Sequence, residues 1–196
     1  NYPVFILYNK SNIPKRPENL SKYNYVLKSL IKGCNLLKKN KCKFIVIPCN
    51  TAHHWYDDLQ KKIKIPIISM PKEVYLHTKK TCKKNSKIGI LCTEATLKTK
   101  VYSKYFNKYF NLVSPSKSLQ ISSVNKAIRL VKTGKVKEAE KAIKPAVNHL
   151  IKLKCKKIIL GCTELPIAIF AYKSFKKIKK SKTFIDPNLL LSLIHI

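Results

Sequence analysis

The chain has 196 residues, 45% hydrophobic and 26% charged, which supports one medium domain or two small lobes and excludes a disordered tail. Lysine interrupts every apolar run before it reaches the roughly 18 to 20 residues of a membrane span, so no membrane partner is expected. The formal net charge is +32, yet only Arg16 and Arg129 among the 41 basic residues are arginine. Because nucleic-acid readers rely on arginine and the lysines are scattered over every segment, we expect no specific nucleic-acid partner.

Short β-rich apolar runs alternate along the chain with lysine-rich segments of helical period. The expected strands cover residues 4–8, 44–47, 66–69, 87–91, 157–160 and 183–185. The expected helices cover residues 20–39, 51–63, 72–84, 96–110 and 124–153, the last with breaks at Gly134 and Pro145. This alternation predicts an α/β fold with mostly parallel strands, and functional residues are then expected on loops at the carboxyl ends of the strands.

One segment of the sequence is repeated. Residues 41–51 align without a gap on residues 154–164, and each copy has a helical pattern, a buried strand and then a cysteine, Cys49 or Cys162. The offset of 113 residues is far too long for a solenoid. The repeat therefore predicts two similar lobes that face each other, each contributing one thiol to a shared cleft.

Each of these thiols precedes a helix start that is marked by Asn50 and Thr51 in one copy and by Thr163 in the other. Free backbone N–H groups at a helix start favour a thiolate and can also bind a carboxylate. Two thiols on opposite walls suit the removal of a proton from one face of a carbon acid and its return on the other face, with one cysteine as thiolate and the other as thiol. Such a site inverts a stereocentre. The alternative is that both are small buried core cysteines.

The two cysteine motifs also carry a family resemblance that covers nearly the whole chain. Residues 48–53 and 161–165, at this separation, are similar to the two signature motifs of the aspartate/glutamate racemase family, specifically its aspartate racemase branch. Glu164 stands where the cell-wall glutamate racemases carry His, which favours the aspartate branch. Weaker similarity lies in residues 8–16, 65–70, 131–134 and 184–187.

The resemblance implies a cofactor-independent amino-acid racemase, a homodimer of two pseudo-symmetric α/β lobes with the site in the cleft between them. It assigns residues 1–66 with 175–196 to the first lobe and residues 67–174 to the second. Cys49 and Cys162 become the acid/base pair, and the substrate is a small amino acid, most closely aspartate. The implied substrate-binding residues are Asn9, Arg16, Asn50, Thr51, Thr96, Lys132, Thr163 and Glu164, of which Arg16 and Lys132 hold the side-chain carboxylate.

The sequence also departs from the family pattern. The family's first strand and Gly-rich loop precede the position of Tyr2 and are not in this sequence, so we expect one wall of the site to be missing from it. Lys15 replaces the usual Asp beside the substrate arginine, and residues 191–196 match a scar from sequencing-library preparation. The segment around Cys92 mimics the catalytic motif but aligns with a family segment that lacks a catalytic thiol, so Cys92 is expected to be inert.

Other readings of the same residues remain open. Cys49, His53 and His54 lie close together, but no second pair completes a four-ligand zinc set, so no metal is expected. Seven unclustered cysteines predict free thiols in a reducing, cytoplasmic compartment. The alternative functions are a glutamate or broad-specificity amino-acid racemase, and a basic, non-catalytic binding protein on the same fold.

Overall fold

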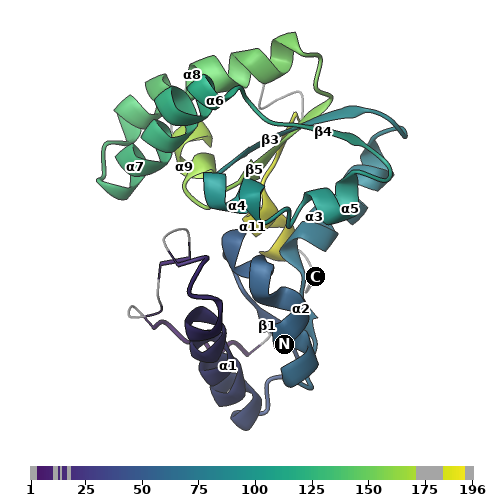
Figure 1. Ribbon diagram of the computed structural model, residues 1–196, viewed down its shortest axis with the longest axis vertical. Helices are drawn as coiled ribbons and strands as arrows, with labels where there is room; N and C mark the ends of the chain where they lie inside the picture. Colours follow the sequence, from purple (N-terminus) through teal and green to yellow (C-terminus); the bar gives the residue numbers. More distant parts are fainter. Residues whose placement is uncertain (1–3, 11–12, 14, 17–18, 171–182, 193–196) are drawn as a thin grey trace.

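A computed structural model describes residues 4–10, 13, 15–16, 19–170 and 183–192 of the chain. It contains two sheets, one in each of two lobes stacked along the long axis of the molecule (Figure 1). The smaller sheet pairs β1 (Ile45–Val46) with β2 (Ile67–Ile68), and the larger has the order β4 (Asn111–Val113), β3 (Lys87–Cys92), β5 (Lys157–Gly161) and β6 (Phe184–Ile185). All pairs are parallel, which confirms the predicted α/β fold class.

Helices flank both sheets, and their bounds follow in chain order. They are α1 (Tyr23–Lys39), the 3-10 helix η1 (Thr51–Trp55), α2 (Tyr56–Lys62), α3 (Met70–Thr81), α4 (Glu94–Lys98), α5 (Ser103–Phe106), α6 (Lys117–Leu119), the π-helix η2 (Gln120–Asn125), α7 (Lys126–Lys132), α8 (Val136–Lys152), α9 (Leu165–Phe170) and α11 (Pro187–Ser192). Among the described residues, no helix combines the length and the apolar character needed to cross a bilayer.

The first lobe is built on the apolar stripe of α1. Val26, Leu30 and Cys34 are buried at helical spacing and pack with Trp55 of η1 and Leu59 of α2. This cluster also takes in the inward-facing residues of β1 and β2, so the short sheet is held mainly by its helices.

The second lobe follows the two-residue period of its strands. Ile158 and Leu160 face the helices α7, α8 and α9, whereas Ile88, Ile90 and Ile159 face the aromatic cluster of α3 and α5 on the other side of the sheet. Figure 1 shows these two groups of helices on opposite faces of the larger sheet. Because β3 and β5 are buried on both faces, the carboxyl ends of these central strands are fixed firmly in space.

Two local predictions are wrong for physical reasons. The helix break expected at Pro145 does not occur, because the hydroxyl of Ser123 enters the helix, donating to the carbonyl of Ala142 at 2.5 Å and accepting from the backbone N–H of Ala146 at 3.3 Å. The strand expected at residues 4–8 is absent, and Val4 is 95% exposed, since no strand among the described residues offers its backbone a ladder.

The closing strand also lies elsewhere than expected. The expected first lobe includes residues 183–185, but β6 pairs in parallel with β5 and extends the larger sheet. Ile185 is buried in the same cluster as Ile159, which explains the placement. The smaller sheet in turn takes β2, just beyond the expected boundary at residue 66. Residues 175–182 and 193–196 of the expected first lobe lie outside the described residues.

Candidate active site

Several of the predicted site residues lie at the carboxyl ends of β3 and β5, among them Cys162, Thr163 and Glu164. From these adjacent strands the chain continues outward in opposite directions, to β4 on one side and to β6 on the other. In open parallel sheets, ligands bind outside the carboxyl ends of the strands at such a switch point. Cys92 and Gly161 are partners in the register, so Thr93 and Cys162 begin neighbouring loops.

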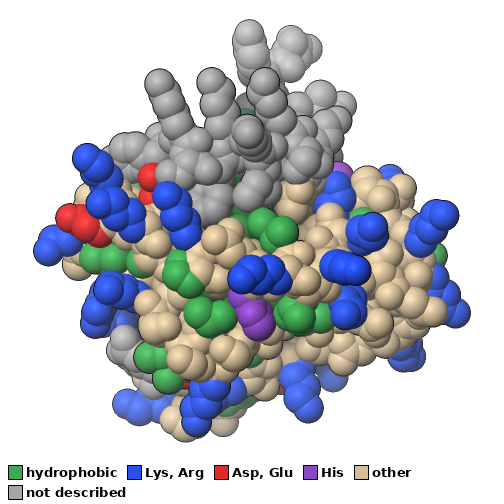
Figure 2. Space-filling model, turned by 90° about the horizontal axis from the view of Figure 1, so that it is seen from above, with side chains coloured by type: hydrophobic (Ala, Val, Ile, Leu, Met, Phe, Trp, Pro, Cys, Tyr) green, Lys and Arg blue, Asp and Glu red, His purple; other side chains and the backbone are tan. Residues whose placement is uncertain are grey.

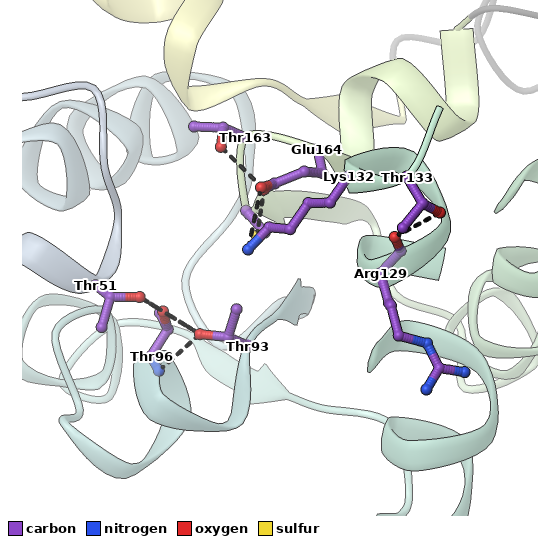
Figure 3. Close-up of polar contacts among 9 residues, drawn as sticks. Thr51, Thr93, Thr96, Arg129, Lys132, Thr133, Thr163 and Glu164 are labelled. Atoms are coloured by element: carbon purple, nitrogen blue, oxygen red, sulfur yellow. Dashed lines mark hydrogen bonds and ion pairs between the residues drawn. The ribbon is translucent and has the colours of Figure 1, made fainter. Parts of the chain in front are cut away.

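A carboxylate forms the centre of the second cysteine motif. The Cys162 thiol donates to Glu164 Oε2 at 2.9 Å, and the Thr163 hydroxyl donates to the same oxygen at 3.0 Å. Lys132 Nζ lies 3.5 Å from Glu164 Oε1. Figure 3 shows Glu164 between Thr163 and Lys132, drawn from the loop after β5 and the end of α7. Four residues singled out by the sequence therefore meet here.

Burial and charge set the protonation states of this cluster. Burial raises the pKa of the Cys162 thiol well above its usual value, and the neighbouring Glu164 carboxylate raises it further. Burial alone would raise the pKa of Glu164, but the hydrogen bonds from Cys162 and Thr163 and the charge of Lys132 together hold it below its usual value. Near neutral pH the pair is therefore a thiol donor and an ionised acceptor.

The first cysteine motif lies in the loop after β1. Cys49 is half-buried, and its carbonyl accepts from the backbone N–H of Ala52 at 3.2 Å and from His53 Nδ1 at 3.0 Å. The other ring nitrogen of His53 accepts from the backbone N–H of Met70 at 3.0 Å. Burial lowers the pKa of His53, which keeps the ring neutral and suited to one donated and one accepted bond. His53 thus ties the cysteine loop to the start of α3.

The same contacts bear on the zinc alternative. Both nitrogens of His53 are engaged by backbone groups, and His54 packs against the rings of Tyr23 and Trp55. In the part of the chain that the structure describes, no group of three or more metal-ligating side chains converges.

Polar side chains of the first motif reach across to the second lobe. Thr51 Oγ1 lies 2.8 Å from Thr96 Oγ1, and Thr93 Oγ1 lies 3.0 Å from the same atom. Thr93 also caps α4 by accepting from the backbone N–H of Thr96 (Figure 3). The Tyr102 hydroxyl donates to Asn50 Oδ1 at 2.5 Å. These bonds hold the Cys49 loop at the carboxyl end of β3, which pairs with β5, the strand that ends just before Cys162.

Comparison with known proteins identifies the family. The family model described as Asp/Glu/Hydantoin racemase matches residues 1–191. The chain belongs to this racemase family. It is 26% identical over 164 residues to the broad specificity amino-acid racemase RacX of Bacillus subtilis, covering 84% of this chain and 70% of RacX. It is 28% identical over 157 residues to glutamate racemase 3 of Caldanaerobacter subterraneus, covering 78% of this chain and 54% of that relative.

Among solved structures, the aspartate racemase of Picrophilus torridus is similar to this racemase-family chain. The TM-score is 0.77 with 27% identity, and the match covers 97% of this chain and 78% of that structure. The two-lobe α/β architecture is therefore shared with a structurally characterised racemase.

The contacts described above form two groups, one around Glu164 and one that joins Asn50 and Thr51 to Thr96 and Tyr102, and two predicted site residues, Asn9 and Arg16, are in neither. Asn9 is exposed in the stretch that precedes α1. Arg16 lies in the same region, half-buried, and its carbonyl accepts from the backbone N–H of Asn19 at 3.3 Å. Their roles toward a substrate stay predictions.

Two residues of the site were missed from the sequence, Thr93 and Tyr102. The signal for Thr93 was present, because residues 92–94 repeat the Cys-Thr-Glu order of residues 162–164. No local pattern marks Tyr102, whose partner Asn50 is 52 residues away. Cys92 itself is fully buried, and burial raises the pKa of its thiol far above the ordinary range, so it is poorly suited to act as a thiolate.

The charged side chains of the described residues are dispersed on the face seen in Figure 2. Figure 2 shows lysine and arginine side chains spread over the visible face, with no continuous stripe. Dispersed, solvated charge of this kind contributes to solubility rather than to a specific interface.

Proposed function

We propose that this racemase-family chain is a cofactor-independent amino-acid racemase that interconverts L- and D-aspartate by proton transfer between Cys49 and Cys162. The observation that supports this most strongly is the Cys162 thiol on the ionised Glu164 carboxylate, at the switch point of the larger sheet. A buried thiol that keeps its proton is an acid, and the half-buried Cys49 supplies the complementary base.

The reaction then proceeds in two proton transfers. The Cys49 thiolate takes the α-proton of the amino acid, which forms the Cys49 thiol and a carbanion delocalised onto the α-carboxylate. The Cys162 thiol delivers its proton to the opposite face of the α-carbon and becomes a thiolate, and the product has the inverted configuration. The reverse reaction, or proton exchange with solvent, restores the starting protonation states.

Neighbouring groups orient these steps. Glu164 holds the Cys162 side chain in place by accepting from its thiol, whose proton turns from the carboxylate to the α-carbon in the second step, and Lys132, with its side chain 58% exposed, offers an ammonium to a substrate carboxylate. Asn50, Thr51 and Thr163 contribute amide or hydroxyl donors for the α-carboxylate, whose negative charge grows as the proton leaves. Arg16 is assigned to the second carboxylate, because a guanidinium binds a carboxylate in a bidentate manner.

The preference for aspartate rests on the presence of Glu164 after the second cysteine and on the similarity to the Picrophilus torridus aspartate racemase. Glutamate and broad-specificity racemisation are the alternatives, suggested by the named activities of the other two relatives. We also propose a homodimer in the cytoplasm, where a reducing environment keeps all seven cysteines as thiols.

The test is to express the protein with the family's first strand and Gly-rich loop restored ahead of Tyr2, and to incubate it with each enantiomer of aspartate in heavy water, without pyridoxal phosphate or metal. NMR reports deuterium at the α-carbon, and chiral chromatography reports inversion. We expect inversion by the wild type and by Cys92→Ala, and none by Cys49→Ala or Cys162→Ala. Each active-site variant keeps one base, so any remaining exchange should be confined to one enantiomer, opposite for the two variants.

Three results would each contradict the proposal. The first is loss of activity in a chelator, and the second is a requirement for pyridoxal phosphate. The third is an inactive Cys92→Ala variant beside active Cys49→Ala and Cys162→Ala variants. The same assay with glutamate and with neutral amino acids separates the alternatives by their relative rates.

A further inference from the structure

A tyrosine of the second lobe holds an amide of the first. Tyr102 precedes α5, its side chain is 2% exposed, and it packs in the aromatic cluster with Phe106 and Phe110. Its hydroxyl leaves that cluster and donates to Asn50 Oδ1 at 2.5 Å. Asn50 directly follows Cys49, so one hydrogen bond connects the core of one lobe with the cysteine loop of the other.

The direction of this bond is fixed. Burial raises the pKa of Tyr102 well above its ordinary value, and the neighbouring Cys92, Asp186 and Cys162 raise it further. The hydroxyl therefore keeps its proton, and Asn50 Oδ1 is the acceptor it has among the described residues. With the Asn50 carbonyl oxygen facing Tyr102, the N–H2 group faces away, and a turned amide would leave the buried hydroxyl without that acceptor.

The Asn50 amide nitrogen has no acceptor among the described residues. Within those residues, the fully buried side-chain polar atoms without a partner are Gln120 Oε1 and Asn188 Oδ1. The Asn50 nitrogen is not among them, so it is accessible to solvent. The amide is thus held at one end by protein and leaves two N–H donors available at the other. The next residue, Thr51, contacts Thr93 and Thr96 at the carboxyl end of β3, the strand paired with the one that precedes Cys162.

We propose that Tyr102 is a positioning residue that orients the Asn50 carboxamide so that its two N–H donors bind the α-carboxylate of the substrate. This inference rests on the proposed function and extends it to a residue outside the cysteine motifs. A carboxamide without a fixed partner can turn over and present its oxygen, which repels a carboxylate. The Tyr102 hydroxyl prevents that reversal.

The test compares Tyr102→Phe with Tyr105→Phe in the full-length protein. Both changes remove only a hydroxyl, and Tyr105 also reaches the other lobe, where its hydroxyl lies 3.4 Å from Ser69 Oγ. We expect Tyr102→Phe to lower kcat/KM for aspartate about three- to tenfold, as for one net hydrogen bond, and Tyr105→Phe to change it by less than about twofold. The aspartate-induced rise in Tm should shrink in Tyr102→Phe alone, which reports binding without turnover.

Two further variants separate positioning from general stability. In an Asn50→Ala background, Tyr102→Phe should have no additional effect on kcat/KM or on the aspartate-induced rise in Tm. Asn50→Asp keeps an acceptor for Tyr102 and loses the two donors, so it should lose the rise in Tm with aspartate, measured against the Tm of the free variant.

Each outcome is decisive. If the wild type racemises no amino acid, the proposed function fails, whatever the variants do. If the wild type is active and Tyr102→Phe behaves like Tyr105→Phe, or if its effect persists unchanged in the Asn50→Ala background, the positioning role of Tyr102 is overturned.

Discussion

The contact between β3 and β5 beside the second thiol allows a quantitative prediction. Gly161 precedes Cys162 and is the register partner of Cys92. A Cβ atom at position 161 would lie 2.9 Å from the Cys92 Cβ and 3.3 Å from the Leu91 carbonyl oxygen. Carbon atoms pack at about 3.5 to 4.0 Å, so Gly161→Ala must push the two strands apart by about half an ångström or more.

Overpacking of this kind costs about 1 to 3 kcal/mol in a well-packed core. Alanine lowers the conformational entropy of the unfolded chain relative to glycine, which stabilises the folded state by about 0.4 to 1 kcal/mol and offsets part of this cost. We therefore expect Gly161→Ala to lower the free energy of unfolding by about 0.5 to 2 kcal/mol. Urea denaturation followed by far-ultraviolet circular dichroism measures this change.

A pair of double variants tests the cause. Cys92→Gly removes the Cβ that meets the new methyl group, so Gly161→Ala should be less destabilising in that background by about 1 kcal/mol. Cys92→Ala removes only the sulfur and keeps the Cβ, so it should give no such relief. A strictly additive Cys92→Gly/Gly161→Ala pair, or equal relief from Cys92→Ala, would refute the steric reasoning.

Three other predictions follow from burial and charge. Burial lowers the pKa of His53, so its contribution to stability is complete above about pH 6.5, the unfolded value, and is lost as the pH falls through the folded pKa. In urea denaturation, His53→Gln should therefore reduce the fall of the midpoint between neutral pH and about pH 5. Leu150→Ala should lower the free energy of unfolding by about 2 to 5 kcal/mol, because this side chain is 0% exposed. Ile151→Ala, on the outer face of the same helix and 38% exposed, should lower it by less than about 1 kcal/mol. Equal losses would contradict the assigned core. Glu164→Gln removes the charge that raises the pKa of Cys162, so the ultraviolet thiolate signal should begin at lower pH than in the wild type, and an unchanged titration would exclude the coupling.

Fold class was predictable because buried strands and amphipathic helices leave strong periodic signals. The run at residues 157–160 is observed as β5, and the helical pattern at residues 20–39 as α1. By contrast, β4 has three residues, of which Asn111 is exposed, at the edge of the sheet, and such a segment carries no periodicity. The continuity of α8 through Pro145 depends on Ser123, which is distant in sequence and so cannot be inferred locally.

The candidate site shows the same division between local and distant information. The contacts among Cys162, Thr163 and Glu164 are nearly consecutive in sequence, so the motif placed them together. The contacts of Thr51 with Thr96 and of Asn50 with Tyr102 span 45 and 52 residues. They depend on how two lobes meet, which propensity and spacing do not encode.

The chemistry of the surface between the lobes has a consequence for substrate entry. The three apolar clusters each belong to one lobe. The contacts between residues 50–69 and 93–105 include the hydrogen bonds of Asn50, Thr51 and Ser69, and Lys104 adds an ion pair with Asp57 and a contact with the Tyr56 ring. When two hydroxyl groups separate, each can form a hydrogen bond to water instead, so the net free-energy cost per bond is small. Separating an apolar interface would instead expose apolar surface to water, which is unfavourable. An amino acid is itself polar and hydrated, so hydroxyl groups between the lobes can replace its bound water molecules with protein hydrogen bonds one at a time.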